Sequence, residues 1–335
     1  MSRRSVRSLV LLVVTLVVAV TACAGPAPAP PDTKAITTGG ERFSVADTET
    51  AALGSDAEPG VFPRTVRHAR GETVLDAAPQ RVVVLDTGEL DDVLSLGLTP
   101  VGVATTDGQI PAYLEPKLGD ATRLGLLDPL NLEGIAALRP DLIVGSRLRV
   151  DRYYDQLAAI APTVLSIRPG FPWKENLRLV GDALGAETAA TELLNAYQTR
   201  ANGIRDSIGP DAPTISLVRF MPGRLRLYGN LSFIGVILAD IGLPRPPEQD
   251  IQELAVEISE ERIDQADAGQ IFYSSFGDPA RNGRDAVVGG ELWERLPAVA
   301  AGNVAEVDDS VWFLGLGPTG ANLVLDDLTA YFADR

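Results

Sequence analysis

Residues 171–209 read FPWKENLRLVGDALGAETAATELLNAYQTRANGIRDSIG, and this stretch decides the fold. Apolar side chains such as Leu177 and Val180 recur along it at helical spacing. Gly185 either ends a first helix or bends a single long one, and Gly209 supplies a stop. At about 1.5 Å per residue the segment spans roughly 50 Å, which is longer than one small domain is wide. We therefore predict a helical connection between two lobes, with the functional groove between them.

The stretches on either side of this connection have the pattern of α/β structure. Residues 81–86 (RVVVLD) and 141–145 (DLIVG) are continuous hydrophobic runs separated by helical patterns, which is typical of a covered parallel sheet. Strand-like and helical runs alternate again over residues 214–332. We expect two α/β lobes with mainly parallel central sheets, and ligands of such sheets bind at the loops after the strands. The expected parts are an N-terminal lobe over residues 61–170, the connecting helix over 171–209 and a C-terminal lobe over 210–335.

The first 60 residues have the features of an export signal and a linker. Three arginines precede an apolar run at residues 9–20, which is short for a membrane span and ends in small residues. Residues 20–23 (VTAC) resemble a bacterial lipobox, so we expect residues 1–23 to be a lipoprotein signal peptide and Cys23 to carry the lipid. An uncleaved anchor helix is the alternative, and general secretory and twin-arginine export both remain open. Residues 24–60 are proline-rich at their start and polar, which predicts a disordered tether.

The composition argues against several classes of function. A formal net charge of −16 makes the chain a poor general binder of nucleic acid. Binding of any anion would therefore require a local cluster of arginines. Cys23 is the only cysteine and His68 the only histidine. They allow no intramolecular disulfide, no metal site of histidine and cysteine, and no nucleophile with a histidine base at the predicted sheet loops. We therefore expect no catalytic residue, no resident metal or cofactor, and no enzyme activity.

Several phrases in order resemble one family. They are TVRHARGET, APQRVVVLD, LGLTPVGVA, NLEGIAALRPDLIVGS, YDQLAAIAPTV, WKENLRLVGDALG, VRFMPGRLRLYG and SFIGVILADIGLPRP. Over residues 64–334 the chain resembles the periplasmic binding proteins of ABC importers for ferric siderophores, haem and vitamin B12. The resemblance implies two α/β lobes joined by one long helix, with little hinge motion. It also implies a monomeric receptor, anchored by lipid to the outer face of the cell membrane, that captures a ferric chelate and delivers it to an ABC permease.

The predicted ligand site draws on arginines and aromatic rings. Arg219 and Arg226 flank a turn at the start of the second lobe, and Arg147 follows DLIVG, where Arg149 or Arg152 could take its place. A guanidinium fork suits the oxygens of an iron chelate, and flat rings pack on its apolar backbone. The rings expected near the mouth of the cleft are Tyr113, Trp173, Tyr228 and Trp312. The alternatives are a solvated edge for the arginines and core packing for the rings.

Two acidic residues and one missing arginine refine this prediction. Glu133 and Glu261 each lie in a short helix before a buried strand, and the resemblance implies that they dock with arginines of the permease. An ordinary acidic residue in a first helical turn is the alternative. Residues 232–235 read SFIG where catecholate-binding relatives often have Ser-Arg-Phe-Gly, which favours a hydroxamate ligand. Haem or cobalamin binding, or a non-transporting envelope interaction protein on the same scaffold, are the other possibilities.

Overall fold

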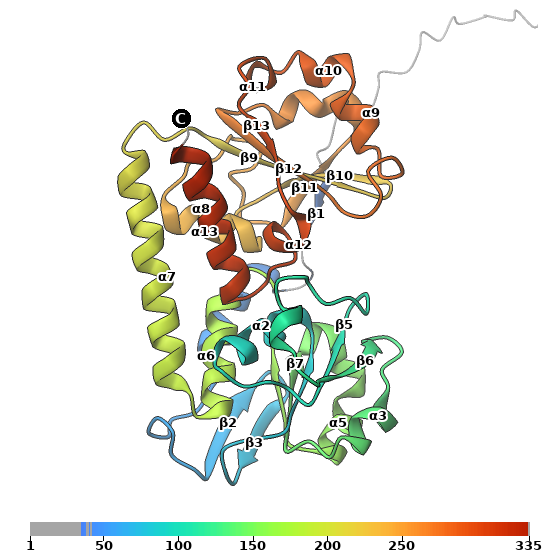
Figure 1. Ribbon diagram of the computed structural model, residues 1–335, viewed down its shortest axis with the longest axis vertical. Coiled ribbons are helices and arrows are strands. Elements are labelled where there is room, and N and C mark those ends of the chain that lie inside the picture. Colours follow the sequence, from blue (N-terminus) through green and yellow to red (C-terminus); the bar gives the residue numbers. More distant parts are fainter. Residues whose placement is uncertain (1–34, 38–39, 41, 334–335) are drawn as a thin grey trace, which may run out of the picture. The chain divides into compact units, whose positions relative to one another are not determined.

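The N-terminal lobe is organised around a parallel sheet (Figure 1). The computed structural model describes residues 35–37, 40 and 42–333, so the predicted signal peptide and Cys23 lie outside the described residues. The five strands, in the order β6-β5-β4-β7-β8, are β4 (Val82–Leu85), β5 (Gly102–Thr105), β6 (Thr122–Leu126), β7 (Leu142–Ser146) and β8 (Thr163–Ser166). All neighbouring pairs are parallel. The carboxyl ends of these strands therefore lie along one edge, where parallel sheets bind ligands.

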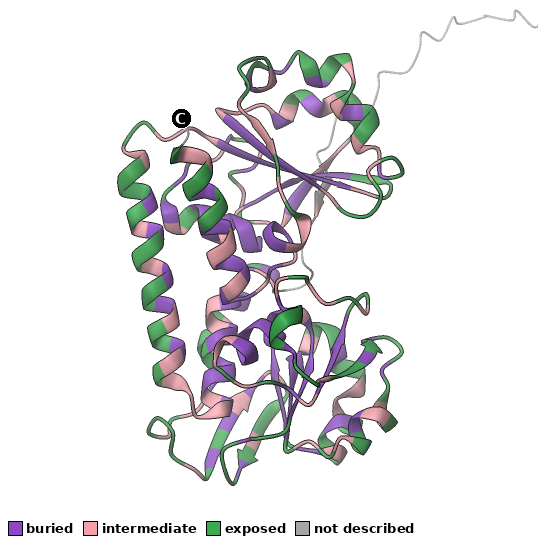
Figure 2. Ribbon diagram, viewed as in Figure 1, coloured by how far each residue is buried: buried purple, intermediate pink, exposed green. Residues whose placement is uncertain are grey.

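Helices bury both faces of this sheet, as Figure 2 shows by its purple strands. The covering helices are α2 (Thr87–Ser95), α3 (Leu132–Ala137), α5 (Tyr154–Ile160) and α6 (Trp173–Leu184), and a hairpin of β2 (Arg64–His68) and β3 (Gly71–Leu75) adds to the α2 side. Val82 and Val84 face α2 and α6, whereas Val83 and Leu85 face α3 and α5. The continuous hydrophobic runs in the sequence follow from this burial on both faces.

The connection between the lobes consists of two helices packed on one another. α6 ends at Gly185, whose φ of 69° is the left-handed conformation that commonly terminates helices. α7 (Glu187–Ile208) then runs to the C-terminal lobe. A Cβ atom on Gly181 would lie 2.9 Å from the Cβ of Ala190, so a glycine is needed where the two helices meet. The sequence left open whether Gly185 ends a first helix or bends a single long one, and in the structure it ends α6.

The C-terminal lobe contains a mixed six-stranded sheet in the order β1-β11-β10-β9-β12-β13. Its strands are β1 (Ala35–Thr37), β9 (Ile215–Met221), β10 (Arg224–Tyr228), β11 (Ala255–Ile258), β12 (Gln270–Ser275) and β13 (Val304–Glu306). β9, β12 and β13 pair in parallel, and the remaining pairs are antiparallel. The fold class of two α/β lobes is confirmed, but this sheet is mixed because a tight turn at Gly223 folds β10 back on β9.

The remaining helices cover the second sheet and close its loops. They are α8 (Phe233–Ile241), η4 (Glu260–Ala266), α9 (Arg284–Val288), α10 (Glu291–Glu294), α11 (Pro297–Ala300), α12 (Asp309–Trp312) and α13 (Pro318–Ala333). α8, α12 and α13 form the core with α7, whereas η4, α9, α10 and α11 cover the opposite face. Among the described residues no helix is both long and apolar enough to cross a membrane.

Residues 42–60, which we name the N-terminal strap, correct the prediction of a disordered tether over 24–60. The strap contains η1 (Phe43–Val45) and α1 (Ala46–Ala51), and β1 before it pairs with β11. Phe43 is buried against Phe171, with ring centroids 5.1 Å apart, and Gly54 exchanges two backbone hydrogen bonds with Arg67 of β2. The sequence pattern misses this order because few large hydrophobic residues are needed to dock a short segment.

Replacing Phe43 tests whether the strap belongs to the folded body. We expect Phe43→Ala to lower the free energy of unfolding by about 3 kcal/mol, because it opens a cavity against Phe171. Val45→Ala is the matched control, since Val45 is 39% exposed and its truncation changes stability by no more than about 0.5 kcal/mol. Chemical denaturation of both variants makes the measurement. Equal stabilities would mean that the strap does not contribute to folding.

Candidate ligand-binding site

A cavity of about 270 Å³ lies where the loops of the two lobes meet, and we name it the inter-lobe cavity. The N-terminal lobe supplies loops that follow β4, β5 and β7, and the C-terminal lobe supplies loops that follow β12 and β13. The lining side chains used below are Asp86, Ile110, Arg149, Phe276, Leu314 and Leu316. Every contributing loop follows the carboxyl end of a strand, which is where the sequence places the ligand.

Asp86 and Arg149 form an ion pair at this cavity. Arg149 Nε donates a hydrogen bond to Asp86 Oδ2 at 3.1 Å, and the Asp86 side chain is almost fully buried. Asp86 has φ 149° and ψ 163°, a conformation that non-glycine residues seldom adopt. Leu316, from the opposite lobe, also has a positive φ of 52°. Backbone strain of about 1–3 kcal/mol per residue at both walls of one cavity makes this place the candidate functional site.

Buried carboxyl groups lie on α2 behind the ion pair. Glu89 Oε1 accepts a hydrogen bond from Ser166 Oγ at 2.7 Å, and its Oε2 has no hydrogen-bond partner among the described residues. Burial, reinforced by the charge of Asp86, raises the pKa of Glu89 to about 7, whereas Ser166 and Arg149 act to lower it. Burial also raises the pKa of Asp92 well above its usual range. These residues are not among the predicted site residues, although their position directly after RVVVLD was a usable signal.

Arg219, predicted to contact the ligand, is engaged in a buried network. Its Nε and Nη2 donate to the two carboxylate oxygens of Asp309 at 2.7 and 2.6 Å, and its Nη1 donates to the Tyr228 hydroxyl at 3.0 Å. Ser274 Oγ also donates to Asp309, at 2.7 Å. The Tyr228 ring packs edge-on against Phe313. Arg219 is 6% exposed, so the network holds its guanidinium away from solvent.

Arg226 and Arg147 lie apart from the inter-lobe cavity. Arg226 is opposite Arg219 in the sheet and donates from Nε and Nη2 to Glu257 Oε1 at 3.0 and 2.7 Å. Arg147 lies on α4 (Arg147–Val150), as Arg149 does, but it lines a second cavity of about 270 Å³ together with strap residues. Of the three alternatives after DLIVG, the structure places Arg149 at the inter-lobe cavity.

The four predicted aromatic residues are more buried than expected. Trp173 and Trp312 are fully buried in the core of the C-terminal lobe, which corrects their predicted place near the mouth of the cleft. Their large apolar rings gain more from core packing than from a position in a loop. Tyr228 belongs to the same core. Tyr113 is half-buried, and its hydroxyl donates to the Gly315 carbonyl at 3.0 Å, across the contact between the lobes.

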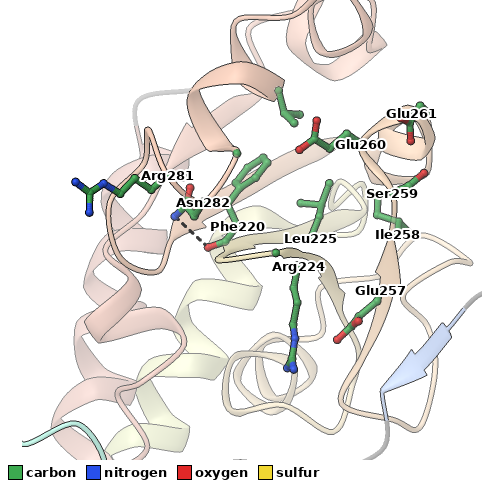
Figure 3. A pocket seen from close by; sticks show the side chains of 13 residues that line it. Phe220, Arg224, Leu225, Glu257, Ile258, Ser259, Glu260, Glu261, Arg281 and Asn282 are labelled. Carbon is green, nitrogen blue, oxygen red and sulfur yellow. Dashed lines mark hydrogen bonds between the residues drawn. The ribbon is translucent and has the colours of Figure 1, made fainter.

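Glu133 and Glu261 are both exposed, one on each lobe. Glu133 lies in the first turn of α3, where Gly134 N donates to the Asn131 side chain at 2.9 Å. Glu261 lies in the first turn of η4, beside a groove of about 510 Å³ that is shown in Figure 3. A hydrogen bond with Ser259 lowers the pKa of Glu261, so it carries a negative charge at neutral pH. Both are therefore accessible to a partner.

Replacing Arg219 tests whether this residue supports the fold. We expect Arg219→Gln to lower the free energy of unfolding by about 3 kcal/mol, because Asp309 is left buried without its cation. The double variant Arg219→Gln/Asp309→Asn recovers part of this loss. Arg224→Gln is the matched control, since Arg224 is exposed on the same sheet. Thermal and urea unfolding measure the series, and a loss no larger than that of the control contradicts the structural role.

Comparisons with known proteins identify relatives of the whole fold. The chain is 35% identical over 285 residues to the probable siderophore-binding lipoprotein YfiY of Bacillus subtilis, covering 80% of this chain and 87% of that protein. It is 31% identical to the achromobactin-binding periplasmic protein of Dickeya dadantii, covering 75% and 85%. The solved structure of Staphylococcus aureus SirA complexed with staphyloferrin B matches with a TM-score of 0.73 and 30% identity, covering 80% and 98%.

The resemblance stated from the sequence phrases is thereby confirmed. The pattern of one family matches residues 82–311, from β4 to α12, and so includes the strands that carry the inter-lobe cavity. Of the relatives named above, one is a probable siderophore-binding lipoprotein and another an achromobactin-binding periplasmic protein. The chain belongs to the periplasmic binding protein family.

Proposed function

We propose that this protein captures a ferric siderophore in the inter-lobe cavity and delivers it to a membrane ABC permease. The observation that carries the proposal is the cavity itself, which lies between two α/β lobes at the ends of parallel strands. The relatives support it, since YfiY is named a probable siderophore-binding lipoprotein and SirA was solved with staphyloferrin B. The iron arrives already chelated, so the protein recognises the complex and supplies no ligand to the metal.

Arg149 is the residue that we assign to the chelate oxygens. Its side chain is 34% exposed, and only its Nε is hydrogen-bonded among the described residues, to Asp86. The two terminal nitrogens therefore remain to donate to an anionic oxygen. Ile110, Phe276 and Leu314 supply the apolar part of the wall. One arginine within a largely apolar wall suits a chelate that presents an anionic oxygen on an otherwise apolar body, and hydroxamate remains the proposed type.

A panel of ligands tests this function. Saturable quenching of the intrinsic fluorescence of the full-length protein by a ferric hydroxamate, with no response to the iron-free chelator, is the expected result. Ferric citrate, haem and cobalamin complete the panel, and preferential binding of one of these would replace the hydroxamate assignment. Failure of all four to quench would favour a non-transporting envelope protein on the same scaffold.

Replacing Arg149 tests its role in the same titration. We expect Arg149→Gln to weaken binding of the ferric hydroxamate about 10- to 100-fold, because a hydrogen bond from a charged donor is lost. Arg152→Gln is the matched control, because Arg152 is exposed and pairs with Asp128 outside the cavity. Equal affinities of the two variants would exclude Arg149 from the ligand site.

Delivery to the permease rests on the two exposed carboxylates. We expect Glu133→Ala/Glu261→Ala to abolish iron uptake by cells and to leave ligand affinity unchanged, since neither residue lines the inter-lobe cavity. Glu72→Ala/Glu294→Ala is the matched control, which removes two other exposed carboxylates, and it leaves uptake intact. A fall in ligand affinity of the first variant would contradict the docking role.

The remaining parts of the proposal concern the place of the protein in the cell. We propose that the protein is a monomer, anchored by a lipid on Cys23 to the outer face of the cell membrane. The lipobox-like residues 20–23 support the anchor. We also propose that the chain divides into two lobes, at residues 61–170 and 210–335, joined by residues 171–209. The strap belongs to the folded part.

A further inference from the structure

Three charged groups form a row from the inter-lobe cavity into the protein. Arg149 lies at the cavity wall, Asp86 pairs with it at 3.1 Å, and Glu89 lies fully buried one helical turn further along α2. One oxygen of Glu89 accepts from Ser166, and the other has no hydrogen-bond partner among the described residues. Burial without full hydrogen bonding disfavours the ionised form of a carboxyl group, so such a group binds a proton more readily than an exposed one.

The charge of Glu89 depends on its neighbours, because burial leaves little water to screen them. On its own helix it faces the carboxyl groups of Asp86 and Asp92, and Asp91 lies beyond Asp92. β8 supplies the Ser166 hydroxyl, and α4 supplies Arg149. These influences include one cation, Arg149, and that cation is also the group that we assign to the ligand. Arg168 is a second cation near Arg149, and it lines the cavity at the strap.

We propose that Glu89 is a positioning residue that couples ligand capture to the uptake of a proton from solvent, through Arg149. An anionic oxygen of the chelate neutralises Arg149, the Glu89 carboxylate loses the cation that supports its charge, and it binds a proton. The proposal rests on the proposed function, because it needs an anionic group at Arg149. Arg149 Nε stays on Asp86 while its terminal nitrogens bind the ligand, so the Asp86 carboxylate keeps its place.

The direction of the pH effect follows from the neighbours of Glu89. In the ligand-free protein burial and Asp86 raise the pKa of Glu89 to about 7, and Arg149 opposes that rise. Neutralising Arg149 raises the pKa further, so binding takes up protons near neutral pH. The affinity for the ligand therefore increases as the pH falls through neutrality, and it levels off once the pH is well below the ligand-free pKa of about 7.

Calorimetric titration of the full-length protein with a ferric hydroxamate, in two buffers of different ionisation enthalpy at pH 7, measures the proton uptake. We expect an uptake for the unmodified protein and none for Glu89→Gln, which keeps the shape of the side chain. Ser166→Ala is a second variant, outside the cavity lining; it removes a hydrogen bond that favours the Glu89 carboxylate and so moves the pH dependence to higher pH. Equal proton uptake by the protein and by Glu89→Gln would overturn the proposal.

A measurement without ligand separates this inference from the proposed function. Carboxyl carbon NMR of the full-length protein follows the titration of Glu89, which is assigned by the loss of its signal in Glu89→Gln. We expect Arg149→Gln to raise the Glu89 midpoint, whereas Arg152→Gln leaves it unchanged. An unchanged midpoint in Arg149→Gln would overturn the coupling. If no chelate binds at all, the proposed function fails, and this titration still decides whether Arg149 controls the charge of Glu89.

Discussion

Asp91 of α2 joins the two lobes through a buried hydrogen bond. Its Oδ2 accepts a hydrogen bond from Gly320 N in the first turn of α13, at 3.0 Å, although the side chain is fully buried. The approach is so close that a Cβ atom on Gly317 would lie 2.6 Å from the Cβ of Asp91. A carboxylate at the amino end of a helix satisfies a backbone donor and complements the helix dipole. The lobes are therefore joined by a polar contact that requires a defined geometry.

The shape of the inter-lobe cavity depends on this contact. Tyr113, in the β5 loop, donates to the Gly315 carbonyl near the start of α13, and Leu316 lies between that glycine and the Asp91 contact. Leu316 lines the cavity with a positive φ, so its conformation is imposed by the polar contacts on either side. A cavity formed in this way is largely present before the ligand arrives, which reduces the cost of ordering loops on binding.

Most of the architecture could be predicted from periodicity and from the family phrases. The hydrophobic runs at β4 and β7 indicate a sheet covered on both faces, and the helical pattern from Trp173 to Ile208 indicates the connection. The strap could not be predicted in the same way. Its ordered conformation depends on the packing of Phe43 against Phe171 and on the pairing of β1 with β11. These are contacts between segments far apart in the chain.

The candidate site could be predicted only in part. The loop after DLIVG was identified, but choosing Arg149 over Arg147 required the structure, because these residues lie two positions apart in the single turn of α4 and line different cavities. Arg219 carries the same charge and forms a buried pair instead, since Asp309 reaches it from another loop. Sequence alone determined the fold class, which follows from local periodicity, and the family, which follows from the ordered phrases, and it predicted the loops that we propose to hold a ligand. Only the tertiary structure decided which charges are neutralised and which remain available, because the partner of each arginine comes from a distant part of the chain.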